Sequence, residues 1–329
     1  MKNSYLITGG TGSFGTAFIK KLLSSKIKIQ RLVIFSRDEL KQSVMQEKYP
    51  KNKYPFIRFF LGDIRDLDRL SFATRNIENI VHAAALKQVP AAEYNPFEAV
   101  KTNIIGAQNL ILASINNNVR KIVALSTDKA CAPINLYGAT KLCSDKLFVS
   151  ANNIVGKSET RFSVVRYGNV FASRGSVYNI FKLYKNKGFF PITDSRMTRF
   201  NITLDEATSM VLNVLKKTEG GEIYVPKLRS FKIVDLAKAM NSKNKMKILG
   251  IRPGEKIHEQ MISSSDSYST VELDNFYVIL PQGNSKLIKK FKKKNKSKIV
   301  KPGFEYSSDK NGSFLSLNEL KKIIKEYEK

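Results

Sequence analysis

Short apolar runs recur along the first half of the chain, and they do not alternate strictly with polar residues. The runs lie at 5–8 (YLIT), 31–36 (RLVIFS), 57–63 (IRFFLGD), 79–85 (NIVHAAA), 121–127 (KIVALST) and 162–170 (FSVVRYGNV). Continuous runs rich in Val and Ile are typical of strands that are buried on both faces of a parallel sheet. The segments between them, such as FGTAFIKKLLSS and NIIGAQNLILASINNN, have the apolar spacing of helices. This alternation predicts the α/β class, with a doubly wound parallel sheet.

The pattern changes beyond residue 172, where Gly, Pro and charged residues interrupt the runs. An amphipathic helix is predicted at 204–218, and GGEIYVP at 220–226 has the composition of one more strand. We therefore predict a sheet domain at 1–172, to which 220–240 returns. A smaller C-terminal lobe at 173–329, interleaved with the sheet domain, would end in a basic segment.

Composition narrows the class of protein. Hydrophobic residues make up 42% of the chain, and no apolar run approaches the roughly 20 residues that span a bilayer. The amino-terminal MKNSYLITGG is too short in its apolar part for a secretory leader. Cys131 and Cys143 have no metal or redox spacing. We therefore predict a cytoplasmic protein with no metal site.

The formal net charge of +28 is compatible with three kinds of partner: nucleic acid, an anionic membrane surface or an acidic small substrate. Much of the excess lies at 286–303 (KLIKKFKKKNKSKIVKPG), where no aromatic residues alternate with the lysines. We attribute the charge to a Lys-rich composition together with an anionic substrate. No nucleic-acid or membrane partner is predicted.

The stretch TGGTGSFG follows the first apolar run and opens a helical pattern. Its glycines, Gly9, Gly12 and Gly15, have the GxxGxxG spacing of a dinucleotide-binding turn. Such glycines allow a tight turn, a close approach of the backbone to a pyrophosphate and close packing of helix on strand. The amino end of the helix then offers unpaired N–H groups to the phosphates. The fold predicted is therefore a Rossmann sheet with a smaller substrate-binding lobe.

The end of the second run indicates which dinucleotide binds. An NAD site places an acid there, whereas this chain has Ser36 and Arg37, with Lys41 one turn later. A hydroxyl and a guanidinium suit a ribose 2′-phosphate, so we predict NADP. Asp38 is the contrary sign, unless it caps the following helix.

Residues at the ends of the third and fourth runs complete the predicted cofactor site. Asp63, in GDI, is placed to accept a hydrogen bond from the adenine amine, and the small residues of HAAALK let the cofactor approach the backbone. His82 follows an apolar strand, which favours a buried packing role over catalysis.

The stretch STDKACAPINLYGATK carries two pairs of reactive groups. Tyr137 and Lys141 lie one helical turn apart, and a nearby ammonium lowers a phenol pKa. We expect this pair, with Thr127 or Ser126, to remove a proton from a substrate alcohol while hydride leaves. Asp128 and Lys129 are surplus to simple oxidation but suit elimination of water, as acid and base. For this, burial must raise the Asp128 pKa, and the Lys129 pKa must fall to about 7–8. The alternative is a plain salt bridge at a strand end.

A YxxxK pair after the fifth strand of such a protein resembles the extended short-chain dehydrogenase/reductase superfamily. Within it, the chain resembles the inverting UDP-N-acetylglucosamine 4,6-dehydratases over about residues 4–265. The matching stretches are SRDELKQS, GDIRDLDRL, AAALKQVPAAEYNP, KTNIIGAQN, ALSTDKA, PINLYGATKLCSDKLF, SVVRYGNVFASRGSV, PITDSRMTRFNITLDEA and GIRPGEKIHE. Retaining dehydratases are expected to carry an acid where this chain has Lys129.

The resemblance implies an NADP-dependent carbon–oxygen lyase that dehydrates UDP-N-acetylglucosamine and inverts C5, the first step of pseudaminic acid biosynthesis for flagellin glycosylation. It also implies a homo-oligomer, a dimer or a hexamer. Catalytic roles would fall to Lys129, Asp128, Tyr137, Lys141 and Thr127. Substrate would be bound by Lys87, Lys129, Asn169, Thr193, Arg199, Arg252 and Glu255. The cofactor would contact Gly9, Thr11, Gly12, Ser13, Phe14, Gly15, Ser36, Arg37, Lys41, Asp63, Ile64, Ala83, Ala84, Ala85, Lys87, Thr102, Tyr137, Lys141, Val170, Ser173 and Arg174.

Two other functions remain open from the sequence. A retaining nucleotide-sugar dehydratase or a 4-epimerase would use the same Tyr137 and Lys141 but would not need Lys129. An anion-binding module that uses the basic segment is the third possibility.

Overall fold

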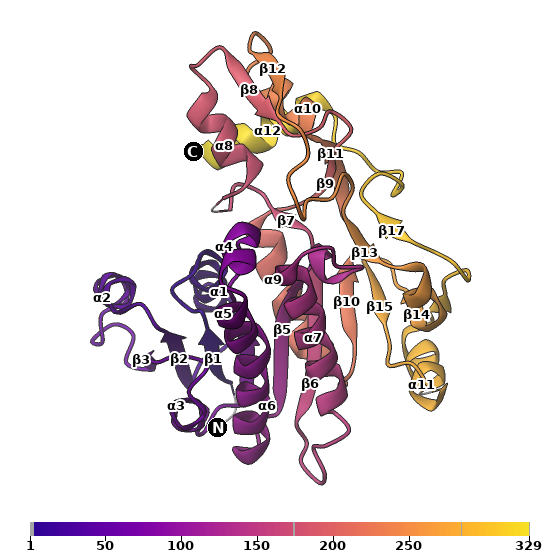
Figure 1. The fold of residues 1–329 in the computed structure, drawn as a ribbon. Coiled ribbons are helices and arrows are strands. Elements are labelled where there is room, and N and C mark those ends of the chain that lie inside the picture. Colours follow the sequence, from indigo (N-terminus) through magenta and orange to yellow (C-terminus); the bar gives the residue numbers. More distant parts are fainter. Residues whose placement is uncertain (1–2, 174, 284, 329) are drawn as a thin grey trace.

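The structure is a computed structural model that describes residues 3–173, 175–283 and 285–328. Within these residues the main sheet has ten strands, in the order β16-β14-β15-β10-β6-β5-β4-β1-β2-β3. The six runs predicted from the sequence form β1 (Ser4–Thr8), β2 (Arg31–Ser36), β3 (Ile57–Leu61), β4 (Asn79–His82), β5 (Lys121–Thr127) and β6 (Arg161–Tyr167). All six are parallel to their neighbours in this set. Figure 1 shows the sheet in the lower half of the molecule, with helices in front and behind.

The order β3-β2-β1-β4-β5-β6 is that of a doubly wound Rossmann sheet, which confirms the predicted fold class. The strand order reverses between β1 and β4, and in such sheets ligands bind outside the carboxyl ends of the strands at this point. The glycine-rich turn follows β1, and the HAAALK stretch follows β4. The topology therefore brings both stretches to the same crevice.

Two layers of helices cover the sheet. Alternate residues of β1 face opposite layers: Ile7 packs in one apolar cluster and Leu6 in the other, and both are fully buried. The first cluster includes side chains of α1 (Ser13–Leu23) and α9 (Leu204–Lys217). The second includes side chains of α3 (Leu67–Ala73), α6 (Gly106–Asn116) and α7 (Leu136–Ala151). Burial on both faces explains why the strands are continuous apolar runs.

The edge beyond β6 is built from later parts of the chain. β10 (Ile223–Pro226) pairs in parallel with β6, as expected for the 220–226 run. The sheet then continues, antiparallel, through β15 (Phe276–Ile279), β14 (Thr270–Glu272) and β16 (Lys298–Ile299). Those last strands were not predicted, because runs of two to four residues carry too little periodicity to be recognised.

A smaller lobe stands above the carboxyl ends of the sheet (Figure 1). It contains α8 (Val177–Tyr184), β8 (Phe189–Ile192), α10 (Ile233–Met240), β12 (Lys245–Ile248) and α12 (Leu317–Glu328). Phe181, Phe190 and Leu236 are fully buried in its own apolar cluster. A three-stranded sheet of β7 (Asn169–Val170), β9 (Thr198–Ile202) and β11 (Arg229–Lys232) connects this lobe with the main body. The division of the chain into domains at residue 172 stays a prediction.

The remaining elements are short or peripheral. They are α2 (Glu39–Lys48), α4 (Val89–Tyr94), α5 (Pro96–Val100), a π-helix (Lys101–Ile105), a 3₁₀ turn η2 (Asp128–Ala130), β13 (Gln260–Ile262), a 3₁₀ helix η3 (Ser264–Ser269), α11 (Ser285–Asn295) and β17 (Tyr306–Ser307). No helix of the described part of the chain is both long and apolar enough to cross a membrane.

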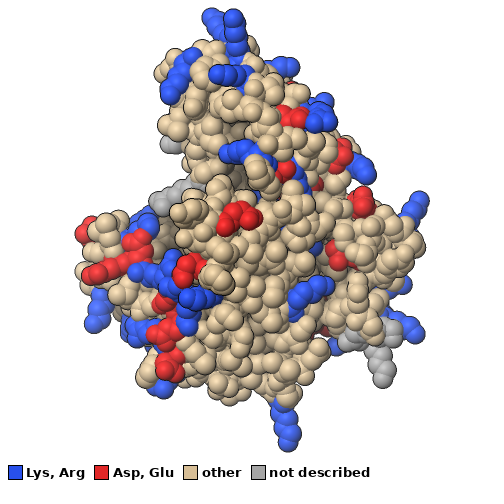
Figure 2. All heavy atoms as spheres, in the orientation of Figure 1, with Lys and Arg blue, Asp and Glu red and all other residues tan. Residues whose placement is uncertain are grey.

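The excess positive charge is dispersed on the face that Figure 2 shows. Lys and Arg side chains stand around its periphery, and Asp and Glu lie among them on the left. The Lys-rich segment forms the amphipathic helix α11, which buries Phe291 in the main core. Lys290 and Lys294 of this helix both form ion pairs with Glu219. Part of the basic segment is thus used in docking this helix.

Candidate active site

A cavity of about 620 Å³ lies between the carboxyl ends of the sheet and the smaller lobe. Its lining comes from both parts of the molecule: Ser13 and Tyr137 from the sheet side, Thr193 and Arg252 from the lobe. The charged residues of the lining are Lys87, Lys129, Lys141, Arg199, Arg252, Lys256, Glu255 and Glu259. Cations therefore predominate, which suits an anionic ligand.

The glycine-rich turn has the close contacts that a dinucleotide site requires. Gly9 has φ +65°, and a Cβ atom there would lie 2.9 Å from the Ala84 nitrogen. A Cβ on Gly15 would lie 2.6 Å from the Gly10 Cα and from the Gly9 oxygen. Gly12 is the N-cap of α1, with no side-chain cap and no acidic residue in the first turn. The residues present therefore fit a pyrophosphate at the positive end of this helix.

Gly15→Ala is expected to lower stability and to abolish retention of the dinucleotide. The added methyl group meets backbone atoms, which cannot move aside as a side chain can, and such overpacking costs about 1–3 kcal/mol. Thermal unfolding and the nucleotide content of the purified variant measure the two effects. Ser24→Ala, at the exposed carboxyl end of the same helix, serves as the control and should match the wild type. Normal nucleotide retention by Gly15→Ala would show that α1 does not pack as described.

The residues on which the prediction of NADP rather than NAD rests form a polar cluster after β2 and β3. Asp38 is the N-cap of α2 and accepts a hydrogen bond from the Lys41 nitrogen at 2.9 Å. Asp63 pairs with Arg65 at 2.8 Å and with Arg37 at 3.4 Å. Partial burial acts to raise the pKa of Asp63, but these two guanidiniums hold this pKa below its ordinary value. The cap accounts for Asp38 without a role in ribose binding.

Tyr137 and Lys141 lie on α7 and both line the cavity. Burial raises the pKa of Tyr137 to about 12, against the charge of Lys129 and a hydrogen bond with Thr127. Burial also lowers the pKa of Lys141, and Asp145 opposes this. The expected net fall of the phenol pKa is therefore wrong for the protein alone: the Lys129 ammonium acts to lower it, but desolvation is the larger effect.

His82 has the surroundings of a core residue. Its Nδ1 lies 2.8 Å from the Thr8 hydroxyl, and its ring packs on Phe148. Burial, aided by the charge of Lys141, lowers the pKa of His82 to about 3. The imidazole is therefore neutral throughout the physiological range.

Asp128 and Lys129 occupy the 3₁₀ turn after β5. The Asp128 carboxylate is fully buried, accepts from the Thr127 hydroxyl at 2.9 Å and lies 3.1 Å from Lys129 Nζ. Burial, with the charge of Glu259, raises the pKa of Asp128, which is the direction that the predicted role as an acid requires. Burial acts to lower the pKa of Lys129, but the charges of Asp128 and Glu259 raise this pKa above its ordinary value. The expected fall of this pKa to near 7–8 is therefore wrong for the protein alone.

Glu259 is part of this cluster, although no spacing rule selects it from the sequence. Its side chain is 3% exposed, and Oε1 lies 3.1 Å from Lys129 Nζ and 3.6 Å from Arg199 Nε. Arg199 donates its other N–H groups to the carbonyl oxygens of Thr198, Lys256 and Ile257. Arg199 is thus held mainly by the protein, while it lines the cavity.

The other predicted residues divide into two groups. Those that line the cavity are Ser13, Phe14, Ala83, Ala84, Ala85, Lys87, Asn169, Val170, Ser173, Thr193, Arg252 and Glu255. Those outside its lining are Gly9, Thr11, Gly12, Gly15, Ser36, Arg37, Lys41, Asp63, Ile64, Thr102 and Asp128. Arg174 lies outside the described residues. Arg252 and Glu255 form a bidentate pair with each other, with distances of 2.9 and 3.0 Å.

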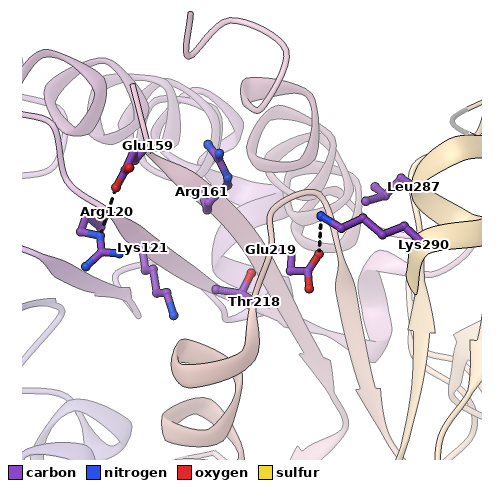
Figure 3. Close-up of a pocket in the computed structure, with 8 residues that line it drawn as sticks. All are labelled: Arg120, Lys121, Glu159, Arg161, Thr218, Glu219, Leu287 and Lys290. Atoms are coloured by element: carbon purple, nitrogen blue, oxygen red, sulfur yellow. Dashed lines mark ion pairs between the residues drawn. The ribbon is translucent and has the colours of Figure 1, made fainter. Parts of the chain in front are cut away.

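A second hollow, of about 450 Å³, lies at the opposite, amino-terminal edge of the sheet. Figure 3 shows Lys121 and Arg161 between two ion pairs, Arg120 with Glu159 and Lys290 with Glu219. Lys121 Nζ donates to the Lys216 oxygen at 3.1 Å. These paired charges form a solvated surface, and none of the motifs lies here. Among the described residues, no group of His, Cys, Asp and Glu side chains is arranged to hold a metal ion.

Comparison with known proteins agrees with this geometry. The family model described as "Polysaccharide biosynthesis protein" matches residues 5–281. The chain is 52% identical to the inverting UDP-N-acetylglucosamine 4,6-dehydratase of Campylobacter jejuni, over 98% of this chain and 97% of that protein. The chain belongs to this polysaccharide biosynthesis family, as a relative of the inverting UDP-N-acetylglucosamine 4,6-dehydratases. The resemblance predicted from the motifs is confirmed, and with it an enzyme of the dehydratase kind.

Other members are similar at greater distance. A protein of Rickettsia akari named UDP-glucose 4-epimerase is 39% identical, over 97% of this chain and 94% of its own. The X-ray structure of Pen from Bacillus thuringiensis superimposes with a TM-score of 0.87 at 36% identity, covering 99% of this chain and 98% of that chain. The family thus includes proteins named for two reactions, and the choice between them depends on the residues of the site.

Proposed function

We propose that the protein is an NADP-dependent, configuration-inverting 4,6-dehydratase of UDP-N-acetylglucosamine. The observation that carries this proposal is the pair of the buried Asp128 and the partly buried Lys129 beside Tyr137 and Lys141. Lys129, Tyr137 and Lys141 share one cavity, and Asp128 Oδ1 lies 3.1 Å from Lys129 Nζ. Tyr137 and Lys141 would serve the removal of hydride and a proton at C4. Asp128 and Lys129 would serve the elimination of water.

The cofactor half of the cavity fits a nicotinamide dinucleotide. The turn at Gly9–Gly15 would hold the pyrophosphate, and Arg37 and Lys41 would hold a ribose 2′-phosphate. Bound there, NADP would supply the acceptor for a hydride from C4 of the sugar and the donor of that hydride to C6. Lys141 would bind the nicotinamide ribose from α7.

Arg37→Ala is expected to raise the Kd for NADP at least about 10-fold, because a guanidinium–phosphate pair is worth about 1.5–3 kcal/mol. The Kd for NAD should change little, since NAD has no 2′-phosphate. Titration of the nucleotide-stripped protein with each dinucleotide, followed by calorimetry, measures this. Arg75→Ala, which removes the same charge from the surface beside Phe72, is the control. Equal weakening of both cofactors would contradict the assignment of Arg37.

Asp128 and Lys129 can supply both an acid and a base by one internal proton transfer. In the ion pair, Lys129 is an ammonium and Asp128 a carboxylate, so neither has the form that elimination needs. If the proton moves from Nζ to Oδ1, Lys129 becomes an amine and Asp128 a carboxylic acid. The amine then takes the C5 proton, and the acid protonates the departing C6 hydroxyl. The raised pKa of Asp128 favours this transfer and the raised pKa of Lys129 opposes it, so the transfer requires bound substrate and cofactor to lower the pKa of Lys129.

The protons balance over the whole reaction. Tyr137 takes the proton of the C4 hydroxyl, for which the phenol must first ionise, and the bound cationic nicotinamide favours the phenolate. Lys129 takes the C5 proton. Asp128 gives one proton to the C6 oxygen, which leaves as water, and the proton held by Tyr137 returns, by exchange through water, to the opposite face of C5. Two protons are removed and two are delivered, so no external acid or base is consumed.

The lobe half of the cavity suits a nucleoside diphosphate. Arg252 offers a planar guanidinium to the diphosphate, and Glu255 accepts from ribose hydroxyls. Thr193 would lie beside the uracil, and Lys87 and Asn169 would contact the sugar and its diphosphate. Because Arg252 and Glu255 pair with each other, substrate must exchange part of this contact for its own.

A 4-epimerase is the second candidate, favoured by the 39% identity to the Rickettsia akari protein. Mass spectrometry after incubation with UDP-N-acetylglucosamine separates the two, because an epimer keeps the mass of the substrate and a dehydrated product loses one water. Loss of water is the result expected. A product of unchanged mass would favour the epimerase.

We also propose the cellular setting. The product would enter pseudaminic acid synthesis for flagellin glycosylation, in the cytoplasm. Self-association as a dimer or hexamer is supported by exposed apolar side chains at α4, α5 and the loop before α7, namely Tyr94, Phe97 and Ile134. Sedimentation velocity of the purified protein tests the oligomer.

A further inference from the structure

The Lys129 ammonium is surrounded by acceptors from three separate parts of the chain. Nζ lies 3.1 Å from Asp128 Oδ1, 3.1 Å from Glu259 Oε1 and 3.4 Å from Asn169 Oδ1. An ammonium has three N–H donors, so these three acceptors can use all of them. Asp128 precedes Lys129 directly, whereas Asn169 comes from β7 and Glu259 directly precedes β13.

We propose that Glu259 is a positioning residue of this site, which fixes Lys129 Nζ in the cavity and sets the proton balance between Lys129 and Asp128. The role rests on the proposed function, because it acts through the residue assigned as the C5 base. Nothing in the local sequence around Lys129 predicts it.

Glu259 is itself held rigidly. Its backbone nitrogen donates to Ser308 Oγ at 2.9 Å, and its carbonyl oxygen accepts from the Ser308 nitrogen at 2.8 Å. The Arg199 guanidinium approaches the same carboxylate oxygen at 3.6 Å. Arg199 is in turn bound to backbone carbonyls, so the chain of contacts from Ser308 to Nζ has little freedom. A carboxylate fixed in this way restricts the positions open to a long, flexible Lys side chain.

Each carboxylate beside Lys129 also has one oxygen that forms no hydrogen bond within the described residues. Asp128 Oδ2 and Glu259 Oε2 are buried, and the described residues offer neither of them a hydrogen-bond partner. Buried polar atoms are rarely left unpaired, and the exceptions are often functional. An acceptor of this kind beside the base is suited to receive a proton or a donor during the reaction.

The charge of Glu259 acts on both members of the pair. The groups that face Lys129 Nζ are Asp128, Glu259 and Arg199 as charges, with Tyr137 and Asn169 as dipoles. The Glu259 carboxylate raises the pKa of Lys129 and of Asp128 alike. The reactive state holds one shared proton, so its pH range lies between two macroscopic pKa values. Removing the Glu259 charge must therefore move both limbs of the pH–rate profile to lower pH.

The test uses Glu259→Gln, which keeps an oxygen acceptor and removes the charge, and Glu259→Asp, which keeps the charge and withdraws it by one methylene. Glu272→Gln, at an exposed position of β14, removes the same charge outside the cavity and is the matched control. The protein is labelled with ¹⁵N-lysine, and the Nζ resonance of Lys129 is assigned by its absence in Lys129→Met. Its titration is followed by NMR, and kcat and KM are measured over pH with UDP-N-acetylglucosamine.

For Glu259→Gln we expect the Lys129 pKa to fall by about 1–3 pH units and both limbs of the kcat profile to move to lower pH. We expect kcat to fall about 10²-fold at neutral pH with little change in KM, as for a misplacement of about 1 Å. Glu259→Asp should lower kcat with a smaller shift of the profile, and Glu272→Gln should match the wild type. Identical Nζ titration in wild type and Glu259→Gln would overturn the proposal, and so would an unchanged pH profile in a folded variant.

Failure of the proposed function is recognised separately. If the wild type does not dehydrate UDP-N-acetylglucosamine, the proposed function fails, whereas the Nζ titration still decides whether Glu259 governs Lys129. If Glu259→Gln does not fold, Glu259→Asp carries the comparison. An Nζ resonance of Glu259→Asp that titrates as in the wild type, together with unchanged kcat, would then overturn the proposal.

Discussion

Lys129→Met is expected to lower the rate of dehydration of UDP-N-acetylglucosamine by about 10²–10⁴-fold, the usual worth of a positioned general base. Met has a similar length and no basic nitrogen, so the substitution removes the proposed C5 base. Tyr137, Lys141 and the glycine-rich turn stay in place. Oxidation at C4 should therefore still occur. The reduced nicotinamide should accumulate and be visible by its absorbance in a single turnover.

The matched control is Lys146→Met, on the exposed side of the same helix as Tyr137. It removes the same charge and should leave both steps unchanged. Thermal unfolding shows whether each variant is folded. If folded Lys129→Met dehydrates substrate at the rate of the wild type, the base is another residue, and the alternative of a salt bridge at a strand end gains support.

Tyr137→Phe is expected to abolish both steps, with a loss of about 10²–10⁴-fold in the first. The phenol oxygen is the group proposed to take the C4 hydroxyl proton, and without such a base hydride cannot leave C4 as a ketone forms. Neither reduced nicotinamide nor a dehydrated product should appear. The ring stays in place, so the packing of α7 should be kept.

The two variants together separate oxidation from elimination. Lys129→Met should stop after oxidation, and Tyr137→Phe should stop before it. Burial raises the pKa of Tyr137 to about 12 in the protein alone, so ionisation is needed before reaction. A phenolate absorbance in the wild type that appears at lower pH with NADP bound, and is missing in Tyr137→Phe, is the matching spectroscopic result. Reduction of the nicotinamide by Tyr137→Phe at an undiminished rate would contradict this role.

The features that could be predicted from the sequence are those with a local pattern. β1, β2, β4, β5 and β6 are runs largely buried on both faces, so their composition alone marks them, whereas β3 lies at the edge of the sheet and is only partly buried. Tyr137 and Lys141 are one turn apart on a helix, and the three glycines lie in one turn. In each case the residues that act together are also neighbours in the chain.

What could not be predicted depends on contacts between distant residues. Glu259 lies 130 residues from Lys129, and no spacing rule connects a residue before a short strand with the end of β5. The pKa shifts predicted for Tyr137 and Lys129 were wrong for the same reason. Their neighbours were identified, but desolvation and the added charge of Glu259 follow only from tertiary packing.

The measurement that tests the central claim most directly is incubation of the purified protein with UDP-N-acetylglucosamine in D₂O, without added cofactor. NMR and mass spectrometry of the product follow. The account predicts loss of one water, one deuterium at C5 and the inverted configuration there, because C5 is deprotonated by Lys129 and reprotonated on the opposite face. A dehydrated product with retained C5 configuration would contradict the inverting assignment, and a product that keeps its water would contradict the dehydratase itself.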